Sequence, residues 1–320
     1  MKKTTMSSFI KKNMMWVILI VLMIVFAILS PNFRSFRNLM NILTQNAYFI
    51  IATVGVAMIM ISGGTDLSVG NAMAVMGVSV ALMMEHGLPV PLAVIIGVLI
   101  GALLGGFNGF SSNLLKIHPM IVTLATMTMF KGISYILSGS KSFYNFDQSY
   151  LNIGQAMVGV ISVPVIIMII ICILVSFVLN KTVFGRFIYA VGGNAETARL
   201  AGVNVHKIKF LTFSFAGALF GIASIILTSR GGSASSQIGP GVEFDAITAC
   251  VLGGVSFIGG AGHVSDAVVG CLILGVLTNG MQMIGMDVNS QYVVKGILLL
   301  VSIGYDTYQQ QAKARKKLTK

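Results

Sequence analysis

The carboxylates beside apolar segments are the residues of this chain best suited to bind a polar solute. Asp66 and Ser68 follow a glycine pair between two apolar runs, and Glu243 and Asp245 open a later run. One interpretation is that these side chains cap the following helices, because a helix N-terminus favours carboxylates. The other is that they lie on a polar path or at its gate, since irregular backbone among apolar helices is tolerated beside a water-filled cavity.

Two lysines fall inside apolar segments. Lys131 lies in the middle of one, where a charge costs about 2.5–3.5 kcal/mol and normally faces the interior of a helix bundle. A functional role or an interior partner is therefore one interpretation of Lys131, and extension of its long side chain to the membrane surface is the other. Lys295 lies nearer the end of its segment, so we expect it to extend to the surface.

No other set of residues suggests catalysis or metal binding. The four histidines are scattered, and no Ser/His/Asp or Cys/His arrangement is discernible. Cys172, Cys250 and Cys271 lie within apolar runs without the spacing of metal ligands. A phosphate-binding loop would need the pattern G-x-x-x-x-G-K-[ST], which does not occur. The sequence thus predicts no enzyme, no metal site and no bound cofactor.

The composition predicts an integral membrane protein. Hydrophobic residues make up 56% of the 320 residues and charged residues 9%, against about 25% charged in a soluble domain. Ten apolar stretches are long enough to cross a bilayer. They span residues 14–30, 46–62, 68–84, 89–110, 119–138, 160–179, 210–228, 244–260, 265–284 and 291–307. We therefore expect one all-α, polytopic transmembrane domain over residues 1–320, with about ten helices.

The positive charges predict the orientation of these helices. The net charge of +12 lies at the ends of apolar segments, which indicates the bias of lysine and arginine toward the cytoplasm rather than nucleic-acid binding. Most of the 21 basic residues fall inside if the N-terminus is cytoplasmic, including a basic tail over residues 308–320. An even number of spans then places both termini in the cytoplasm.

Glycines at every fourth position predict close helix packing. Gly97, Gly101, Gly105 and Gly109 would share one helix face, where the missing side chains let another backbone approach. Gly217 and Gly221 repeat this spacing in a later span.

The polar, basic segment 180–209 should form the main cytoplasmic loop. Within it, Asn194 is placed to cap a short helix, Glu196 falls in its first turn, and Gly202 fits its C-terminal stop. A helix of about two turns is unstable alone in water. We expect it to pack into a groove of a partner or onto its own bundle, the alternative being a solvated connector.

The chain resembles the permease subunits of bacterial ABC importers for ribose, xylose, galactose and related sugars. The resemblance is carried by SGGTDLSVG (62–70), TLATMTMFKGISYILSG (123–139), FGRFIYAVGGNAETARLAGVNVHKIK (184–209), GPGVEFDAITACVLGGVSFIGGAG (239–262) and NGMQMIGMDVNSQYVVKGILLL (279–300). The chain departs from the family's usual pattern at Arg230, Phe244 and residues 263–267.

This resemblance implies a multi-pass protein of the bacterial inner membrane. It implies that two permease subunits, here a homodimer, form the pathway, that a cytoplasmic ATPase supplies energy from ATP, and that an extracytoplasmic binding protein delivers the sugar. The residues implied to contact the ATPase are Gly193, Asn194, Glu196, Arg199 and Gly202. The other hypothesis is an ion-coupled secondary transporter of small polar solutes, which would need carboxylates deep in its spans.

Overall fold

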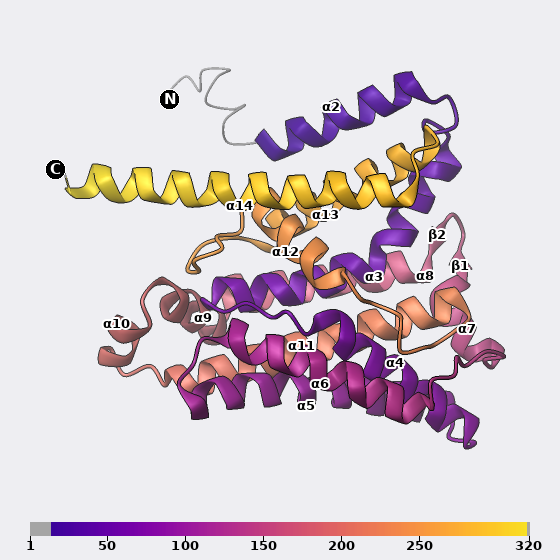
Figure 1. The fold of residues 1–320 in the computed structure, drawn as a ribbon, viewed down its shortest axis with the longest axis horizontal. Coiled ribbons are helices and arrows are strands. Elements are labelled where there is room, and N and C mark those ends of the chain that lie inside the picture. Colours follow the sequence, from indigo (N-terminus) through magenta and orange to yellow (C-terminus); the bar gives the residue numbers. More distant parts are fainter. Residues whose placement is uncertain (1–13, 319–320) are drawn as a thin grey trace.

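The computed structural model describes residues 14–318, and nearly all of its elements are helices (Figure 1). The helices are α2 (Met14–Leu29), α3 (Phe36–Ile61), α4 (Val69–Glu85), α5 (Val90–Leu115), α6 (Pro119–Ser138), α7 (Gln148–Gln155), α8 (Val163–Lys181), α9 (Val183–Gly193), α10 (Ala195–Leu200), α11 (Val205–Gly231), α12 (Val242–Gly253), α13 (Val264–Met283) and α14 (Val288–Leu318). The strands β1 (Met157–Val158) and β2 (Ile161–Ser162) form one antiparallel hairpin.

The helices confirm an all-α membrane protein. Six are long and apolar enough to cross a membrane: α3, α5, α6, α8, α11 and α13. Shorter apolar helices are α2, α4, α9 and residues 288–304 of α14. The predicted basic tail belongs partly to α14, which continues to Leu318, while residues 319–320 and the N-terminal lysines lie outside the described residues.

One predicted span is wrong as a continuous helix. Residues 244–260 were expected to cross the bilayer, yet α12 ends at Gly253 and is 12 residues long. Such a helix is about 18 Å long, whereas the hydrocarbon core is about 30 Å thick. The helix stops because Gly254, Gly259 and Gly260 have φ angles of +113°, +107° and +72°, which no continuing helix can contain.

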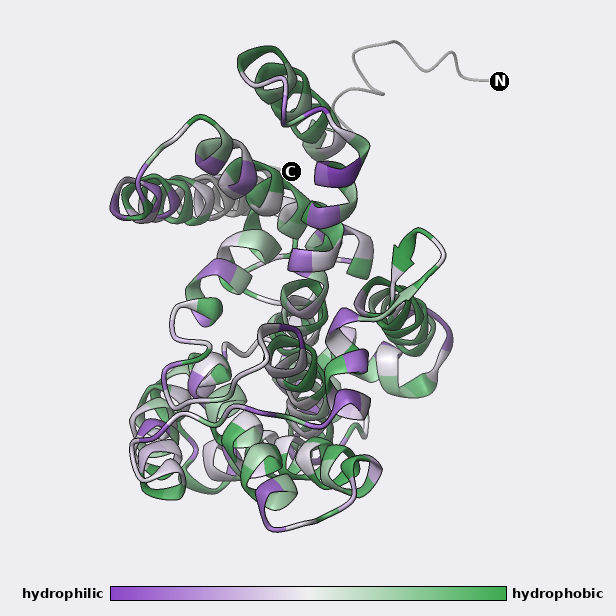
Figure 2. Ribbon diagram, turned by 90° about the vertical axis from the view of Figure 1, so that its right-hand side faces the viewer, coloured by the Kyte–Doolittle hydropathy of each residue, from purple (hydrophilic) through white to green (hydrophobic). Residues whose placement is uncertain are grey.

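Apolar side chains cover the outer faces of the bundle. Figure 2 views many of the helices nearly end-on and shows that hydrophobic residues occur along much of their ribbons. Ile28, Leu103, Ile136 and Leu300 are each more than two-thirds exposed. Large apolar side chains exposed on several helices are suited to lipid or to another membrane subunit, and not to water.

Helices α5 and α11 pack through their glycines, as their spacing predicts. A Cβ atom on Gly101 would lie 2.3 Å from the carbonyl oxygen of Gly217, and one on Gly105 would lie 2.1 Å from that of Phe213. A Cβ on Gly217 would lie 2.1 Å from the oxygen of Gly101. The two backbones therefore touch where neither helix carries a side chain.

The two ends of the bundle differ. Helices α9 and α10 lie at one end together with the C-terminal end of α14, and α7 and the β1–β2 hairpin lie at the other (Figure 1). Helix α7 lies in the segment between α6 and α8. It packs on α11 through Tyr150, which is fully buried and whose hydroxyl lies 2.5 Å from Thr228 Oγ1.

Candidate functional site

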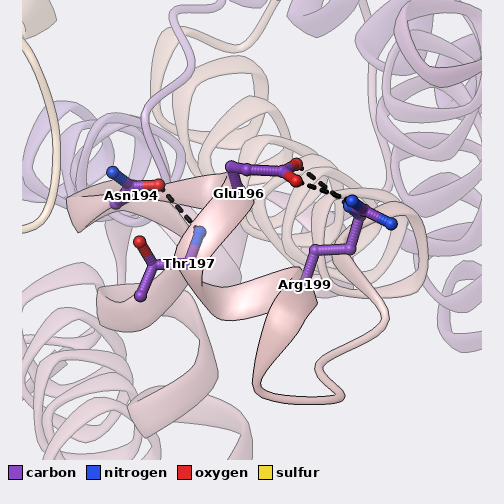
Figure 3. Close-up of polar contacts among 4 residues, drawn as sticks. All are labelled: Asn194, Glu196, Thr197 and Arg199. Atoms are coloured by element: carbon purple, nitrogen blue, oxygen red, sulfur yellow. Dashed lines mark hydrogen bonds and ion pairs between the residues drawn. The ribbon is translucent and has the colours of Figure 1, made fainter.

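The segment 180–209 is mostly helical rather than a loop, and α10 within it confirms the predicted short helix. Asn194 caps this helix by accepting a hydrogen bond from the N–H of Thr197 at 2.8 Å, and Gly202 follows it with φ +84° (Figure 3). Arg199 Nη2 lies 2.6 Å from Glu196 Oε1, with both side chains 64% exposed. Hydrogen bonds from Arg199 lower the pKa of Glu196. An exposed pair of this kind adds little stability, so these charges remain available to a partner.

Helix α9 connects α10 to a tight contact of four glycines, which we name the glycine junction: Gly63, Gly192, Gly259 and Gly260. A Cβ on Gly192 would lie 1.8 Å from the carbonyl oxygen of Ile61, and one on Gly259 would lie 2.7 Å from Gly63 Cα. The N–H of Gly260 donates to the oxygen of Ile61 at 2.9 Å. The end of α3, the end of α9 and the segment after α12 thus meet backbone to backbone.

Asp66 and Ser68 lie together in a buried, non-helical segment before α4. Asp66 Oδ1 accepts hydrogen bonds from Ser68 N at 2.7 Å and Ser68 Oγ at 2.6 Å. Asn108 of α5 donates to Ser68 Oγ at 2.9 Å, and Thr123 of α6 accepts from the N–H of Leu67 at 3.1 Å. Side chains of neighbouring helices therefore satisfy this irregular backbone, as its depth in an apolar protein requires.

The expected helix cap takes a different form at this position. Helix α4 begins at Val69, and the Ser68 side chain makes no capping bond to it. Asp66 instead binds the N–H of Ser68, one residue before the helix. Both side chains are buried and hydrogen-bonded to each other, so their geometry favours a structural role.

Glu243 joins the N-termini of α4 and α12. It is buried in the first turn of α12, and its Oε1 accepts a hydrogen bond from Gly241 N at 3.0 Å. A Cβ on Gly70 would lie 2.5 Å from Glu243 Oε2 and 2.2 Å from the oxygen of Gly239. The capping interpretation of Glu243 agrees with this geometry, and the segment before α12 passes directly over α4.

Asp245 and Lys295 form an ion pair at the edge of a polar cavity. Asp245 Oδ2 of α12 and Lys295 Nζ of α14 are 2.7 Å apart, so the expected extension of Lys295 to the membrane surface is wrong. The cavity has a volume of about 180 Å³. Its other polar lining residues are Gln45, Asn46, Tyr48, Arg230, Thr278, Asn279 and Gln282.

Lys131 lies away from these groups. Its side chain is exposed on α6, and in the described part of the chain it forms no ion pair. An interior partner for Lys131 is therefore not seen among the described residues, and its functional role stays a prediction. Its position fits the alternative, in which the side chain extends along the helix toward the polar surface.

Sequence reasoning missed most of the cavity. Gln45, Asn46 and Asn279 are polar residues inside or beside apolar spans, which is the signal that could have identified them. Arg230 was noted only as a departure from the family's usual pattern. Their convergence depends on how α3, α11 and α13 pack, and no local pattern predicts this.

Together, the apolar helices and the polar cavity between them define a multi-pass membrane protein with a polar compartment. A family model described as "Branched-chain amino acid transport system / permease component" matches residues 38–303. The chain belongs to this family of ABC-transporter permeases, and it is a multi-pass protein of the bacterial inner membrane. Membership of this family implies an ATPase and a substrate-binding protein as partners.

Curated relatives cover nearly the whole chain. It is 40% identical to the L-arabinose transport system permease protein of Escherichia coli over 93% of this chain and 91% of the relative. It is 39% identical to the ribose import permease protein of Bacillus subtilis over 90% of each chain. It is 34% identical to the galactose/methyl galactoside import permease protein of Escherichia coli over 99% of each. No solved structure matches the chain.

Proposed function

We propose that this chain is the translocation subunit of an ATP-driven importer of a monosaccharide. The observation that carries the proposal is its identity of 34–40% to permeases of arabinose, ribose and galactose over 90% or more of their length. The family description names amino acids, but these near-full-length relatives import sugars. Membership of the ABC family also displaces the hypothesis of an ion-coupled transporter.

In this proposal the chain binds no nucleotide or other cofactor, and a partner ATPase hydrolyses ATP. Two copies of the chain, embedded in lipid, form the pathway, and an external binding protein delivers the sugar. About ten segments cross the membrane, with both termini cytoplasmic. The arrangement in Figure 1 supports this orientation, because the end of α14 lies at the same end of the bundle as α9 and α10.

Uptake by intact bacteria tests the substrate class. We expect deletion of this chain's gene to remove high-affinity uptake of one labelled sugar among L-arabinose, ribose and galactose, while L-leucine uptake is unchanged. Uptake should stop when ATP is depleted and persist when the ion gradients alone are collapsed. Loss of leucine uptake with sugar uptake intact would contradict the proposal, as would dependence on an ion gradient with ATP present.

We further propose that α10 docks on the ATPase and that the glycine junction carries its movement into the membrane. Helix α10 has only six residues and is too short to be stable alone. Ala198 is its one buried residue, whereas Leu200 is 75% exposed and the Glu196–Arg199 pair faces outward. Such a helix offers an apolar residue and charges to a partner groove.

Changing these charges should weaken coupling without affecting insertion. We expect Glu196→Ala and Arg199→Glu to lower sugar-stimulated ATP hydrolysis and uptake by about tenfold, the effect of losing about 1.4 kcal/mol of docking. Their amounts in the membrane should equal wild type, because a fully exposed ion pair adds little to stability.

Crosslinking locates the contact in the same system. A cysteine at Leu200, introduced with Cys172→Ser, should crosslink to the ATPase and resist an impermeant external reagent. A cysteine at Val158, which is 63% exposed on the β1–β2 hairpin, is the matched control and should react with that reagent. Crosslinks from Leu200→Cys to the external binding protein would overturn both orientation and coupling.

A further inference from the structure

The polar cavity between α3, α12, α13 and α14 has an unusual chemistry for the inside of apolar helices. Gln45, Asn46, Asn279 and Gln282 contribute amides, which both donate and accept hydrogen bonds. Polar and ionisable residues within membrane helices are rare and normally mark the path of a substrate or ion. The cavity is therefore a candidate contact point for the transported solute.

Arg230 leaves an unused hydrogen-bond donor at this cavity. Its Nε is shielded from solvent and makes no hydrogen bond to any of the described residues. Leaving a buried donor unsatisfied is unfavourable, and a ligand oxygen entering the cavity would satisfy it. The backbone at Arg230 is held by Gln155, whose Nε2 donates to the Arg230 carbonyl oxygen at 3.2 Å.

The cavity shares lining residues with two further hollows. Arg230 lines a groove of about 940 Å³ that includes Asn41 and Gln155 and lies beside the β1–β2 hairpin. Asp245 and Lys295 line a cavity of about 470 Å³ that extends to Thr248 and to Leu299, one helical turn beyond Lys295. Arg230 thus lines both the polar cavity and the groove, and the Asp245–Lys295 pair lines both the polar cavity and the second hollow.

We propose that the polar cavity is a transit site for one monosaccharide, held by Arg230, Asp245 and Lys295. Sugar hydroxyls both donate and accept, so Asp245 accepts from them while Arg230 and Lys295 donate to them. The rings of Tyr48 and Phe49 line the same cavity and offer an apolar surface to the C–H face of a sugar. The proposal rests on the proposed function for the identity of the solute.

The charges at the cavity favour a neutral polyol over a cation. Two cationic side chains face one carboxylate, and that carboxylate is already paired at 2.7 Å. A metal ion or a protonated amine would meet a surplus of positive charge. A sugar requires no countercharge and can replace the bond between Asp245 and Lys295 by bonds to its own hydroxyls, so the pair acts as a partition that the sugar crosses.

Protection of a reporter cysteine tests occupancy of the cavity in the assembled transporter. Thr278 lines the cavity, and we expect a small, hydrophilic thiol reagent to modify Thr278→Cys in a Cys172→Ser background. The transported sugar at millimolar concentration should slow this reaction severalfold. Val158→Cys lies on the β1–β2 hairpin and lines none of the three hollows, so its reaction rate should not respond to sugar. Leu274→Cys, which lines the same cavity and removes no hydrogen-bonding group, replaces the reporter if Thr278→Cys does not transport.

The outcomes separate this site from the importer function. Equal labelling rates with and without sugar, in a reporter variant that still imports sugar, would overturn the transit site and leave the importer intact. Absence of uptake for every tested sugar in the wild type would instead overturn the proposed function.

Variants that neutralise Asp245 and Lys295 show whether the ion pair contacts the sugar or has only a structural role. We expect Asp245→Asn and Lys295→Gln each to lower uptake per transporter at least about tenfold. The double variant Asp245→Asn/Lys295→Gln removes the unpaired charge that each single change leaves. It should stay impaired and lose sugar protection of the reporter cysteine if the pair binds sugar. Recovery of wild-type uptake and protection in the double variant would show that the pair only holds α12 against α14.

Discussion

Replacing Gly192 by alanine is expected to abolish sugar uptake while the permease still reaches the membrane. The added Cβ would lie 1.8 Å from the carbonyl oxygen of Ile61 and 2.8 Å from Gly260 N, and both neighbours are backbone atoms. Neither can rotate away as a side chain would. The methyl group must therefore separate α9 from the end of α3 and disrupt the Gly260–Ile61 hydrogen bond.

The expected size of this effect follows from two contributions. Overpacking by one methyl group costs about 1–3 kcal/mol, and loss of a buried hydrogen bond costs a further ~1–3 kcal/mol. Gly192 has no positive φ, so the change adds steric overlap without backbone strain. Because the glycine junction connects α9 with segments inside the bundle, we expect uptake to fall well over about tenfold.

Two further alanine variants make this prediction specific. A Cβ on the adjacent Gly193 meets no atom within 4 Å, so Gly193→Ala should leave the folded permease intact, and any loss of uptake would arise where the ATPase binds. Gly132→Ala on α6 meets no atom either and should transport normally. Membrane content, uptake and sugar-stimulated ATP hydrolysis would be measured for all three. Wild-type uptake by Gly192→Ala would mean that the glycine junction does not carry the movement of α10 into the membrane.

The features predicted correctly from the sequence are those that local signals determine. Asn194 and Gly202 define the limits of α10 through backbone preferences at helix ends, which need no distant partner. The glycine spacing in α5 predicted a close approach for the same reason, because a period of four residues lies on one helix face. Hydropathy likewise identified most of the apolar helices.

The features that were missed depend on contacts between distant segments. Residues 255–258 are largely apolar and extend the hydropathy signal of α12, yet the following glycines bend the chain to meet Gly63 and Gly192. Asp245 and Lys295 are 50 residues apart, and only the packing of α12 against α14 pairs them. The position of Lys131 on an exposed face also follows from helix orientation, which its position in the span does not fix.

Leucine at Gly105 is expected to remove most of the folded permease from the membrane. A Cβ at this position would lie 2.1 Å from the Phe213 carbonyl oxygen and 3.0 Å from Gly217 Cα, so even the first added carbon overlaps backbone. Leucine adds three more carbons to the same face. Helix association within the bilayer depends on close packing, since lipid tails supply no hydrophobic drive between helices.

The free-energy cost of separating α5 from α11 should therefore exceed the stability of the folded permease. Overpacking by extra methylenes costs about 1–3 kcal/mol when neighbouring side chains can adjust, and rigid backbone on both helices makes the cost larger. Whole-protein stability is only about 5–15 kcal/mol. We expect the amount of folded, monodisperse protein extracted from membranes to fall at least about tenfold. Gly101→Leu should give a similar loss.

A matched change tests whether the face, and not leucine itself, causes the loss. Gly132→Leu makes the same replacement where a Cβ has no neighbour within 4 Å, and it should give wild-type yield. Leu103→Ala truncates a side chain of α5 that is 72% exposed, so it should also be tolerated. Wild-type yield and uptake in both Gly105→Leu and Gly101→Leu would mean that α5 and α11 do not pack through their glycines. Equal losses in Gly132→Leu would attribute the defect to leucine in a membrane helix, whichever face carries it.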